Sequence, residues 1–166
     1  MKDLVIRPPK KNESPVIHQL LLELAEFEQI SSSVIASPES THDALFSKDP
    51  AAHSIIALID NKIVGVAVYF FNYSTFIGRK GLYLEDIYIS ENYRGSSIGT
   101  QMMVQLAKIA NELDCGRMEW TVLDWNVKAI SFYNSIGADI LDNWRIVRMG
   151  KDSIYKLSVS NNTTLN

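Results

Sequence analysis

The sequence predicts an α/β fold in which helices pack against a mixed β-sheet. Segments with helical spacing alternate with short apolar segments typical of strands, in the order strand, two helices, three strands, helix, strand, helix and two strands. The chain has 166 residues, of which 46% are hydrophobic, enough for one domain with its own core. A single cysteine, Cys115, excludes an internal disulfide. We expect residues 1–158 to form one domain and residues 159–166 to form a disordered tail.

The N-terminal part predicts one strand and two helices. The strand Leu4–Arg7 ends at two prolines, which cannot continue a hydrogen-bonded ladder. Apolar residues from Val16 to Phe27 recur at helical spacing, and Ser14 and Pro15 ahead of them are typical of a cap and a first-turn proline. A second, shorter helix is expected from Ser37 to Phe46.

Three strands are expected in the middle of the chain. His53–Ile59 and Lys62–Asn72 flank Asp60-Asn61, a residue pair typical of a hairpin turn. The second of these strands is almost entirely apolar, so both of its faces should be covered. Lys80–Ser90 is predicted to be the third.

The C-terminal part predicts two helices and three further strands. One helix extends from about Ser97 to Asp114 and the other from Val127 to Ile136. A strand from Met118 to Leu123 separates them. Trp144–Met149 and Ser153–Leu157 are expected to form a final hairpin.

Charge and composition exclude several classes of protein. The net charge is −3 and the isoelectric point is about 5.6, so neither nucleic acid nor an anionic membrane is an expected partner. The longest apolar stretch, Ile63 to Phe71, is shorter than the roughly 20 residues that span a bilayer. The histidines lack metal-ligand spacing, and the N-terminus lacks the apolar run of a secretory signal. We therefore expect a cytoplasmic protein that binds no metal.

Two adjacent carboxylates, Glu85 and Asp86, lie in the middle of the third central strand. Side chains alternate along a strand, so these two should point to opposite faces unless a bulge intervenes. Burying an ionised carboxylate is costly unless it is paired. From the strand alone, a paired or edge-exposed acid and a functional acid are both open interpretations.

The segment from Tyr93 to Thr100 joins this strand to the next helix. Small residues such as Gly95 and Gly99 would let a ligand approach the backbone closely, and free N–H groups at a helix start bind phosphate. A simple turn with Ser96 or Ser97 as the helix cap is the alternative interpretation. The segment is neither a Walker loop nor a complete dinucleotide fingerprint.

A third cluster lies between Asn126 and Tyr133. Asn126 could cap the following helix, and its amide could also meet polar groups of a ligand. Ala129 and Tyr133 are four residues apart and share a helix face. A Phe132-Tyr133 pair is usually core packing with the hydroxyl at the edge, and a catalytic tyrosine is the alternative.

Together these three segments resemble the GNAT superfamily of acyl-CoA-dependent N-acetyltransferases. The family's pyrophosphate loop, Arg/Gln-x-x-Gly-x-Gly/Ala, corresponds to Arg94-Gly95-Ser96-Ser97-Ile98-Gly99, with a serine at the first motif glycine. The family element Asn-x-x-Ala-x-x-Phe-Tyr is complete from Asn126 to Tyr133. The resemblance extends from residue 5 to about residue 157 and is greatest for the diamine branch, the spermidine/spermine and thialysine acetyltransferases. It implies a mostly antiparallel central sheet flanked by about four helices.

The resemblance also implies acetyl-CoA as cosubstrate and a small-molecule amine as acceptor. Backbone groups of Ile87, Tyr88 and Ile89 would hold the pantetheine arm. The other implied cofactor-binding residues are Arg94, Gly95, Ser96, Ser97, Ile98, Gly99 and Thr100 around the pyrophosphate, and Asn126, Ala129 and Tyr133 near the thiol. The implied acceptor-binding residues are Phe27, Glu28, Glu85, Asp86, Glu119, Trp120 and Thr121.

The expected reaction moves an acetyl group to the primary amine of a polyamine or a lysine-like acceptor by direct attack. An alkyl ammonium has a pKa of about 10.4, so forming the free amine near neutral pH costs about 4 kcal/mol. Glu85 is expected to remove the proton, directly or through water, and Tyr133 to protonate the departing thiolate.

Two other functions are compatible with the sequence: acetylation of proteins or peptides, and acyl-CoA binding by a regulatory module that has lost catalysis. The close relatives are homodimers, so the resemblance implies a homodimer through the C-terminal strands.

Overall fold

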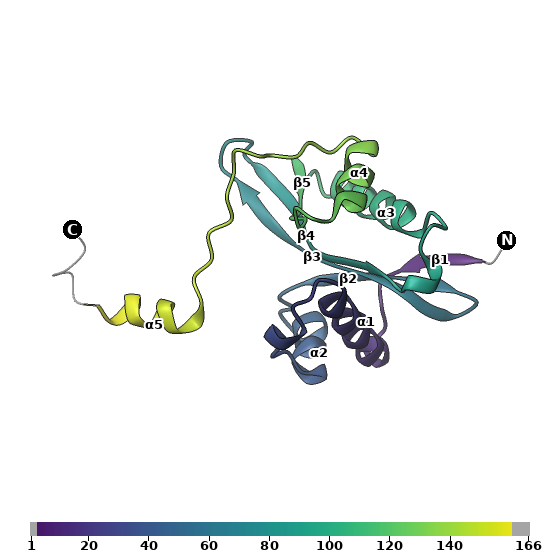
Figure 1. Ribbon diagram of the computed structural model, residues 1–166, viewed down its shortest axis with the longest axis horizontal. Coiled ribbons are helices and arrows are strands. Elements are labelled where there is room, and N and C mark those ends of the chain that lie inside the picture. Colours follow the sequence, from purple (N-terminus) through teal and green to yellow (C-terminus); the bar gives the residue numbers. More distant parts are fainter. Residues whose placement is uncertain (1–2, 161–166) are drawn as a thin grey trace. The chain divides into compact units, whose positions relative to one another are not determined.

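The computed structural model describes residues 3–160, and the chain divides into two compact units between Thr121 and Val122 (Figure 1). The first unit contains the β-sheet, and the second contains helices α4 (Val127–Ser135) and α5 (Lys151–Val159). The expectation of a single domain over residues 1–158 stays a prediction. Most of the expected tail, from residue 161 on, lies outside the described residues, and its first residue, Val159, is the last residue of α5.

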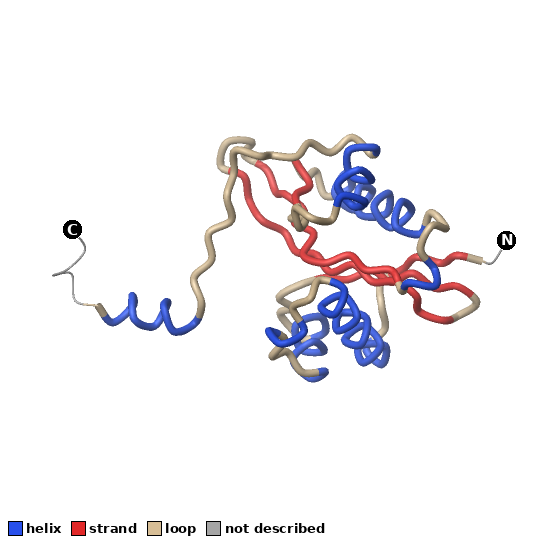
Figure 2. The backbone as a smooth tube through the Cα atoms, viewed as in Figure 1, coloured by secondary structure: helices blue, strands red, loops and turns tan. Residues whose placement is uncertain are grey.

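The strands of the first unit form one sheet in the order β1-β2-β3-β4-β5 (Figure 2). Neighbours among the first four strands are antiparallel, and β5 is parallel to β4. This mixed, mostly antiparallel sheet confirms the predicted fold class. The strands are β1 (Leu4–Arg7), β2 (His53–Ile59), β3 (Lys62–Ser74), β4 (Arg79–Ile89) and β5 (Arg117–Glu119).

The sheet lies between two layers of helices. Helices α1 (Ser14–Phe27) and α2 (Pro38–Phe46) lie on one side of it and α3 (Ile98–Glu112) on the other (Figure 1). On the α1 side, the buried core consists of Ile17, Leu20, Leu24, Ile56, Leu58, Val66, Val68 and Tyr88. On the α3 side, Met102 and Leu106 are fully buried. Helices therefore cover both faces of the sheet (Figure 1), and the fully buried residues of β3 and β4 include Val64, Val66, Leu82 and Leu84.

The predicted hairpin between β2 and β3 is confirmed, and its turn has a clear physical cause. Asp60 and Asn61 have φ angles of 50° and 63°. Two-residue hairpin turns of this left-handed kind match the twist of the strands, and Asp and Asn tolerate the conformation better than most residues.

The first two helices start from different local signals. Ser37 caps α2 by accepting a hydrogen bond of 3.2 Å from the backbone N–H of Ser40, so the helix begins one residue after the predicted start. Helix α1 begins at Ser14 itself, and Glu13 occupies the cap position instead. The Arg7 guanidinium makes two hydrogen bonds to Glu13, of 2.6 and 2.8 Å, and lowers the pKa of that carboxyl to about 2.

The predicted final hairpin is wrong. Trp144–Met149 has no regular structure, and the segment expected as the last strand is part of α5. Ile154 and Leu157 are three residues apart, a helical spacing, and Asp152 in the first turn and Lys156 in the last turn both stabilise the helix dipole. The expected dimer contact through C-terminal strands therefore lacks its strands, and dimerisation itself stays a prediction.

Two smaller features complete the fold. β5 ends at Glu119, four residues before the predicted end of that strand, because it pairs with β4 over three residues only. Short 3-10 helices occupy Lys11–Glu13, Ser31–Ser33 and Glu91–Tyr93. No helix between residues 3 and 160 is both long and apolar enough to cross a bilayer.

Candidate active site

A β-bulge in β4 separates the two adjacent carboxylates. Asp86 pairs with Val68 and Leu84 pairs with Tyr69, so Glu85 is an extra residue without a partner across the strand. Glu85 is exposed, whereas Asp86 is partly buried. The sequence analysis expected these two side chains to point to opposite faces unless a bulge intervened, and a bulge is present. It gives the two acids different environments.

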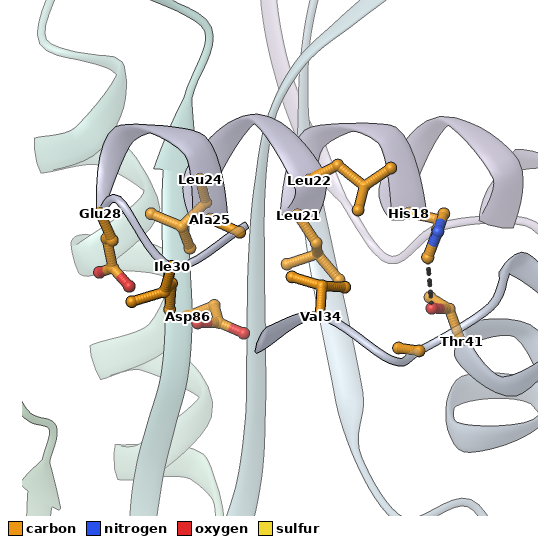
Figure 3. A pocket seen from close by; sticks show the side chains of 11 residues that line it. His18, Leu21, Leu22, Leu24, Ala25, Glu28, Ile30, Val34, Thr41 and Asp86 are labelled. Atoms are coloured by element: carbon orange, nitrogen blue, oxygen red, sulfur yellow. Dashed lines mark hydrogen bonds between the residues drawn. The ribbon is translucent and has the colours of Figure 1, made fainter. Parts of the chain in front are cut away.

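Asp86 lines a pocket together with Glu28 from the C-terminal end of α1 (Figure 3). Burial raises the pKa of Asp86 to about 6, and the charges of Glu85 and Glu28 add to this effect. Burial also raises the pKa of Glu28. The pocket therefore has a concentrated negative charge at one end, which favours a cation, and one carboxylate that can take up a proton near neutral pH.

The edge of β4 beyond Tyr83 is open on the β5 side. β5 pairs with β4 only at Gly81, Leu82 and Tyr83, so residues 86–89 pair with β3 alone among the strands of the described chain. Such an edge presents backbone N–H and C=O groups to an extended molecule that carries amides.

The loop after β4 has a backbone suited to an anion. Gly95 and Ser97 have left-handed φ angles of 76° and 62°, and Ser97 is the cap residue of α3 but makes no side-chain cap hydrogen bond. The first N–H groups of α3 are therefore not satisfied by a capping side chain. A Cβ built on Gly99 would meet no atom within 4 Å, so the fold itself does not require glycine there. The space above Gly99 suits a ligand that approaches the backbone.

Arg94, at the start of this loop, turns its side chain toward α1. Its guanidinium carbon lies 4.8 Å from the ring centre of Phe27 and 5.2 Å from that of Tyr88. Its Nε donates a hydrogen bond of 3.0 Å to the backbone carbonyl of Ile89. Two residues that the resemblance assigned to different ligands, Phe27 and Arg94, are thus in direct contact.

Glu119 is a weaker candidate for binding a cation than the sequence implied. Its carboxylate oxygen Oε2 lies 2.9 Å from Nε of Arg117 and accepts a hydrogen bond of 3.2 Å from Asn72. The charge of Glu119 is therefore already compensated within the sheet. Trp120 and Thr121 follow β5 in irregular structure.

The second unit contains the other expected catalytic segment. Asn126 caps α4, because its side-chain oxygen accepts a hydrogen bond of 3.2 Å from the backbone N–H of Ala129. This confirms the capping interpretation of Asn126. Tyr133 is buried, and its ring centre lies 5.4 Å from that of Phe132.

The structure adds pocket residues that the sequence analysis missed. His18, Leu21, Leu22, Ala25, Ile30, Val34, Ala36 and Thr41 line the pocket with Glu28 and Asp86. The helical spacing of His18, Leu21, Ala25 and Glu28 places them on one face of α1, and this signal was present in the sequence. Among residues 3–160, no group of three or more His, Cys, Asp or Glu side chains is placed to hold a metal ion.

Comparison with known proteins identifies the family. The model of the acetyltransferase (GNAT) family matches residues 18–138, which include the bulged strand, the loop and the segment from Asn126 to Tyr133. The chain belongs to the GNAT acetyltransferase family. It is therefore an acyltransferase of the N-acetyltransferase class, and this family uses acetyl-CoA as cosubstrate.

Three sequence relatives are similar to this GNAT chain over more than nine-tenths of its length. The thialysine N-epsilon-acetyltransferase of Bos taurus is 33% identical and covers 95% of this chain and 99% of its own. The L-ornithine N5-acetyltransferase of Arabidopsis thaliana is 29% identical, with 94% and 88% covered. The spermidine/spermine N(1)-acetyltransferase-like protein 1 of Homo sapiens is 30% identical over 92% of this chain and 23% of its own length.

Solved structures support the same fold. An integron cassette protein from the mobile metagenome of V. cholerae has a TM-score of 0.79 at 27% identity, covering 95% of this chain and 98% of its own. An aminoglycoside acetyltransferase from an uncultured soil metagenomic sample has a TM-score of 0.70 at 17% identity, covering 87% and 97%, and is similar in fold alone.

The residues present fit acetyl-CoA. The open edge of β4 offers backbone groups to the amides of the pantetheine arm. The start of α3, which has no side-chain cap hydrogen bond and has open space at Gly99, offers N–H groups to the pyrophosphate.

Proposed function

We propose that the protein transfers an acetyl group from acetyl-CoA to the primary amine of a small cationic acceptor, either a polyamine or a lysine-like amine. The observation that carries this proposal is the pair of carboxylates, Glu28 and Asp86, in one pocket beside the open edge of β4. The relatives named for thialysine, ornithine and spermidine/spermine support an amine acceptor.

The acceptor's ammonium binds at the acidic end of the pocket. Two carboxylates with pKa values raised by burial are costly to keep ionised without a partner, and a cation removes this cost. Glu85 adds negative charge from the exposed bulge. This charge favours acceptors with a primary ammonium over neutral or acidic ones.

Deprotonation of the bound ammonium is assigned to the adjacent acids. Glu85, acting directly or through water, is the base that the sequence analysis predicts. Asp86 is the alternative, because a carboxylate with a pKa of about 6 is mostly ionised near neutral pH and is a stronger base than an ordinary carboxylate. The two assignments give different pH profiles when each acid is replaced.

Acetyl-CoA supplies the activated acetyl group as a thioester. Backbone groups of Ile87, Tyr88 and Ile89 bind its pantetheine arm, and the N–H groups of the loop from Arg94 to Thr100 bind its phosphates. Donors at the β4 edge stabilise the developing oxyanion, an effect of about 3–4 kcal/mol for such donors. Tyr133 donates a proton to the leaving sulfur.

Mixing the purified protein with acetyl-CoA and a panel of amines, and following thiol release, tests this function. Release with small primary amines supports it. Release only with peptides would favour protein acetylation, and binding of acetyl-CoA without release would favour a regulatory module. The cytoplasmic location and the homodimer are further proposals, which fractionation and sedimentation would test.

A further inference from the structure

The pocket that contains Glu28 and Asp86 extends along α1 well beyond these acids. It has a volume of about 240 Å³ and reaches His18, ten residues before Glu28, at its other end (Figure 3). Ten residues of α-helix rise about 15 Å, so the pocket is long and narrow. A second hollow of about 270 Å³ shares the lining residues Leu21, Ala36 and Thr41 with it, and residues of α2 also line it.

The stretch between the two ends is apolar. We call it the apolar trough; it is lined by Leu21, Leu22, Ala25, Ile30, Val34 and Ala36. At its far end, Nδ1 of His18 lies 2.8 Å from the hydroxyl oxygen of Thr41, so these polar groups satisfy each other. Among the described residues that line the pocket, Glu28 and Asp86 are the only acids. Leu21, Leu22 and Val34 keep part of their surface accessible.

We propose that the apolar trough binds an uncharged hydrocarbon arm of the acceptor, so that amines with one ammonium and an apolar arm are better acceptors than diamines of the same length. This inference rests on the proposed transfer of an acetyl group to a primary amine. Within that reaction it replaces the polyamine alternative by an acceptor that carries a single ammonium. The ammonium stays at the acidic end, and the arm follows α1 toward His18.

Two physical effects support this preference. Each methylene group that leaves water for the trough strengthens binding about fourfold. A second ammonium in the trough would lose its hydration without gaining a carboxylate, because both acids of the pocket are at the other end. A diamine must therefore leave its far end in solvent and lose the contact of its arm.

Heptylamine and hexamethylenediamine test the preference directly. Both present a primary amine followed by six methylene groups, and they differ only in a terminal methyl or a terminal ammonium. We expect kcat/KM, measured by thiol release from acetyl-CoA, to be at least tenfold higher for heptylamine. A ratio of one, or a preference for the diamine, would overturn the inference.

A charge placed in the trough should reverse the preference. Val34→Glu adds a carboxylate to the lining, and we expect it to lower the heptylamine to diamine ratio at least tenfold. Ile35→Glu is the matched control: Ile35 is the next residue, is 98% exposed and does not line the pocket. It should keep the wild-type ratio, and equal shifts in both variants would contradict a specific trough. Ala36→Glu repeats the test at a second lining position if Val34→Glu does not fold.

Failure of the inference is distinguishable from failure of the function. If no amine releases thiol, the proposed function falls and the inference falls with it. If amines release thiol but hexamethylenediamine matches or exceeds heptylamine, the acetyltransferase assignment stands and the trough has no role in selecting the acceptor.

Discussion

The guanidinium of Arg94 lies over the ring of Phe27, 4.8 Å from its centre, and this contact joins the end of α1 to the start of the loop that precedes α3. Tyr88 flanks the guanidinium at 5.2 Å. Phe27 precedes Glu28, which lines the acidic pocket, so the contact links the acceptor side to the proposed phosphate loop. A substitution of Phe27 should therefore change the affinity for coenzyme A.

Phe27→Leu should weaken coenzyme A binding about two- to fivefold, because an exposed cation–π contact contributes about 0.5–1 kcal/mol to holding Arg94. Isothermal titration calorimetry with coenzyme A measures the change. Phe27→Trp keeps an aromatic face and serves as the control, with the wild-type dissociation constant expected. An unchanged constant for the leucine variant would show that the contact does not position Arg94.

The pH profile should identify the base. A carboxylate with a pKa of about 6 must be ionised to accept a proton, so wild-type kcat/KM should rise as the pH increases through about 6. Asp86→Asn should abolish this rise of kcat/KM with pH, the acidic limb of the profile, and should lower activity. Glu85→Gln should retain the acidic limb. If the limb instead survives in Asp86→Asn and is lost in Glu85→Gln, the base is Glu85.

Tyr133→Phe tests the proposed general acid. Loss of the hydroxyl should lower turnover at least tenfold, because proton donation of this kind contributes about 10²–10⁴-fold. Calorimetric binding of coenzyme A should be retained, which separates this result from a folding defect. Unchanged turnover would remove Tyr133 from the mechanism.

Ser97 occupies a left-handed conformation that glycine adopts without strain. A non-glycine residue there costs about 1–2 kcal/mol, and the greater freedom of glycine in the unfolded chain offsets about 0.5–1 kcal/mol of this. Ser97→Gly should therefore raise the free energy of unfolding by about 0.5–1 kcal/mol in urea denaturation and should not weaken coenzyme A binding. Ser96→Gly is the control and should be destabilising, because the Ser96 hydroxyl donates a hydrogen bond to the carbonyl of Tyr93 and its φ is not positive. A lower free energy of unfolding for Ser97→Gly would contradict a strained backbone at Ser97.

The sequence predicted the sheet and most helices because local signals there agree with the packing. The hydrophobic spacing of α1 and the Asp60-Asn61 turn are examples, since both depend on residues close in the chain. The prediction for the segment from Trp144 to Leu157 was wrong because its apolar residues are compatible with either a strand or a helix. Which of the two forms depends on tertiary contacts that the local pattern does not specify.

The candidate site was only partly predictable for a similar reason. Motif spacing identified Glu85, Asp86 and the loop, but the different environments of the two acids follow from the bulge, which depends on the register against β3. The pocket forms where α1 packs beside the segment that contains Val34. The hydrophobic spacing within each segment does not specify how the two pack together.

The most direct test of the proposed function compares wild type with Glu28→Gln, using mass spectrometry of the amine product and calorimetry with coenzyme A. We expect the wild type to form a singly acetylated amine, and Glu28→Gln to raise the KM for the amine at least tenfold while binding coenzyme A as tightly as before. Coenzyme A binding without any acetylated amine, or a KM that the substitution leaves unchanged, would contradict an amine acceptor held in this pocket.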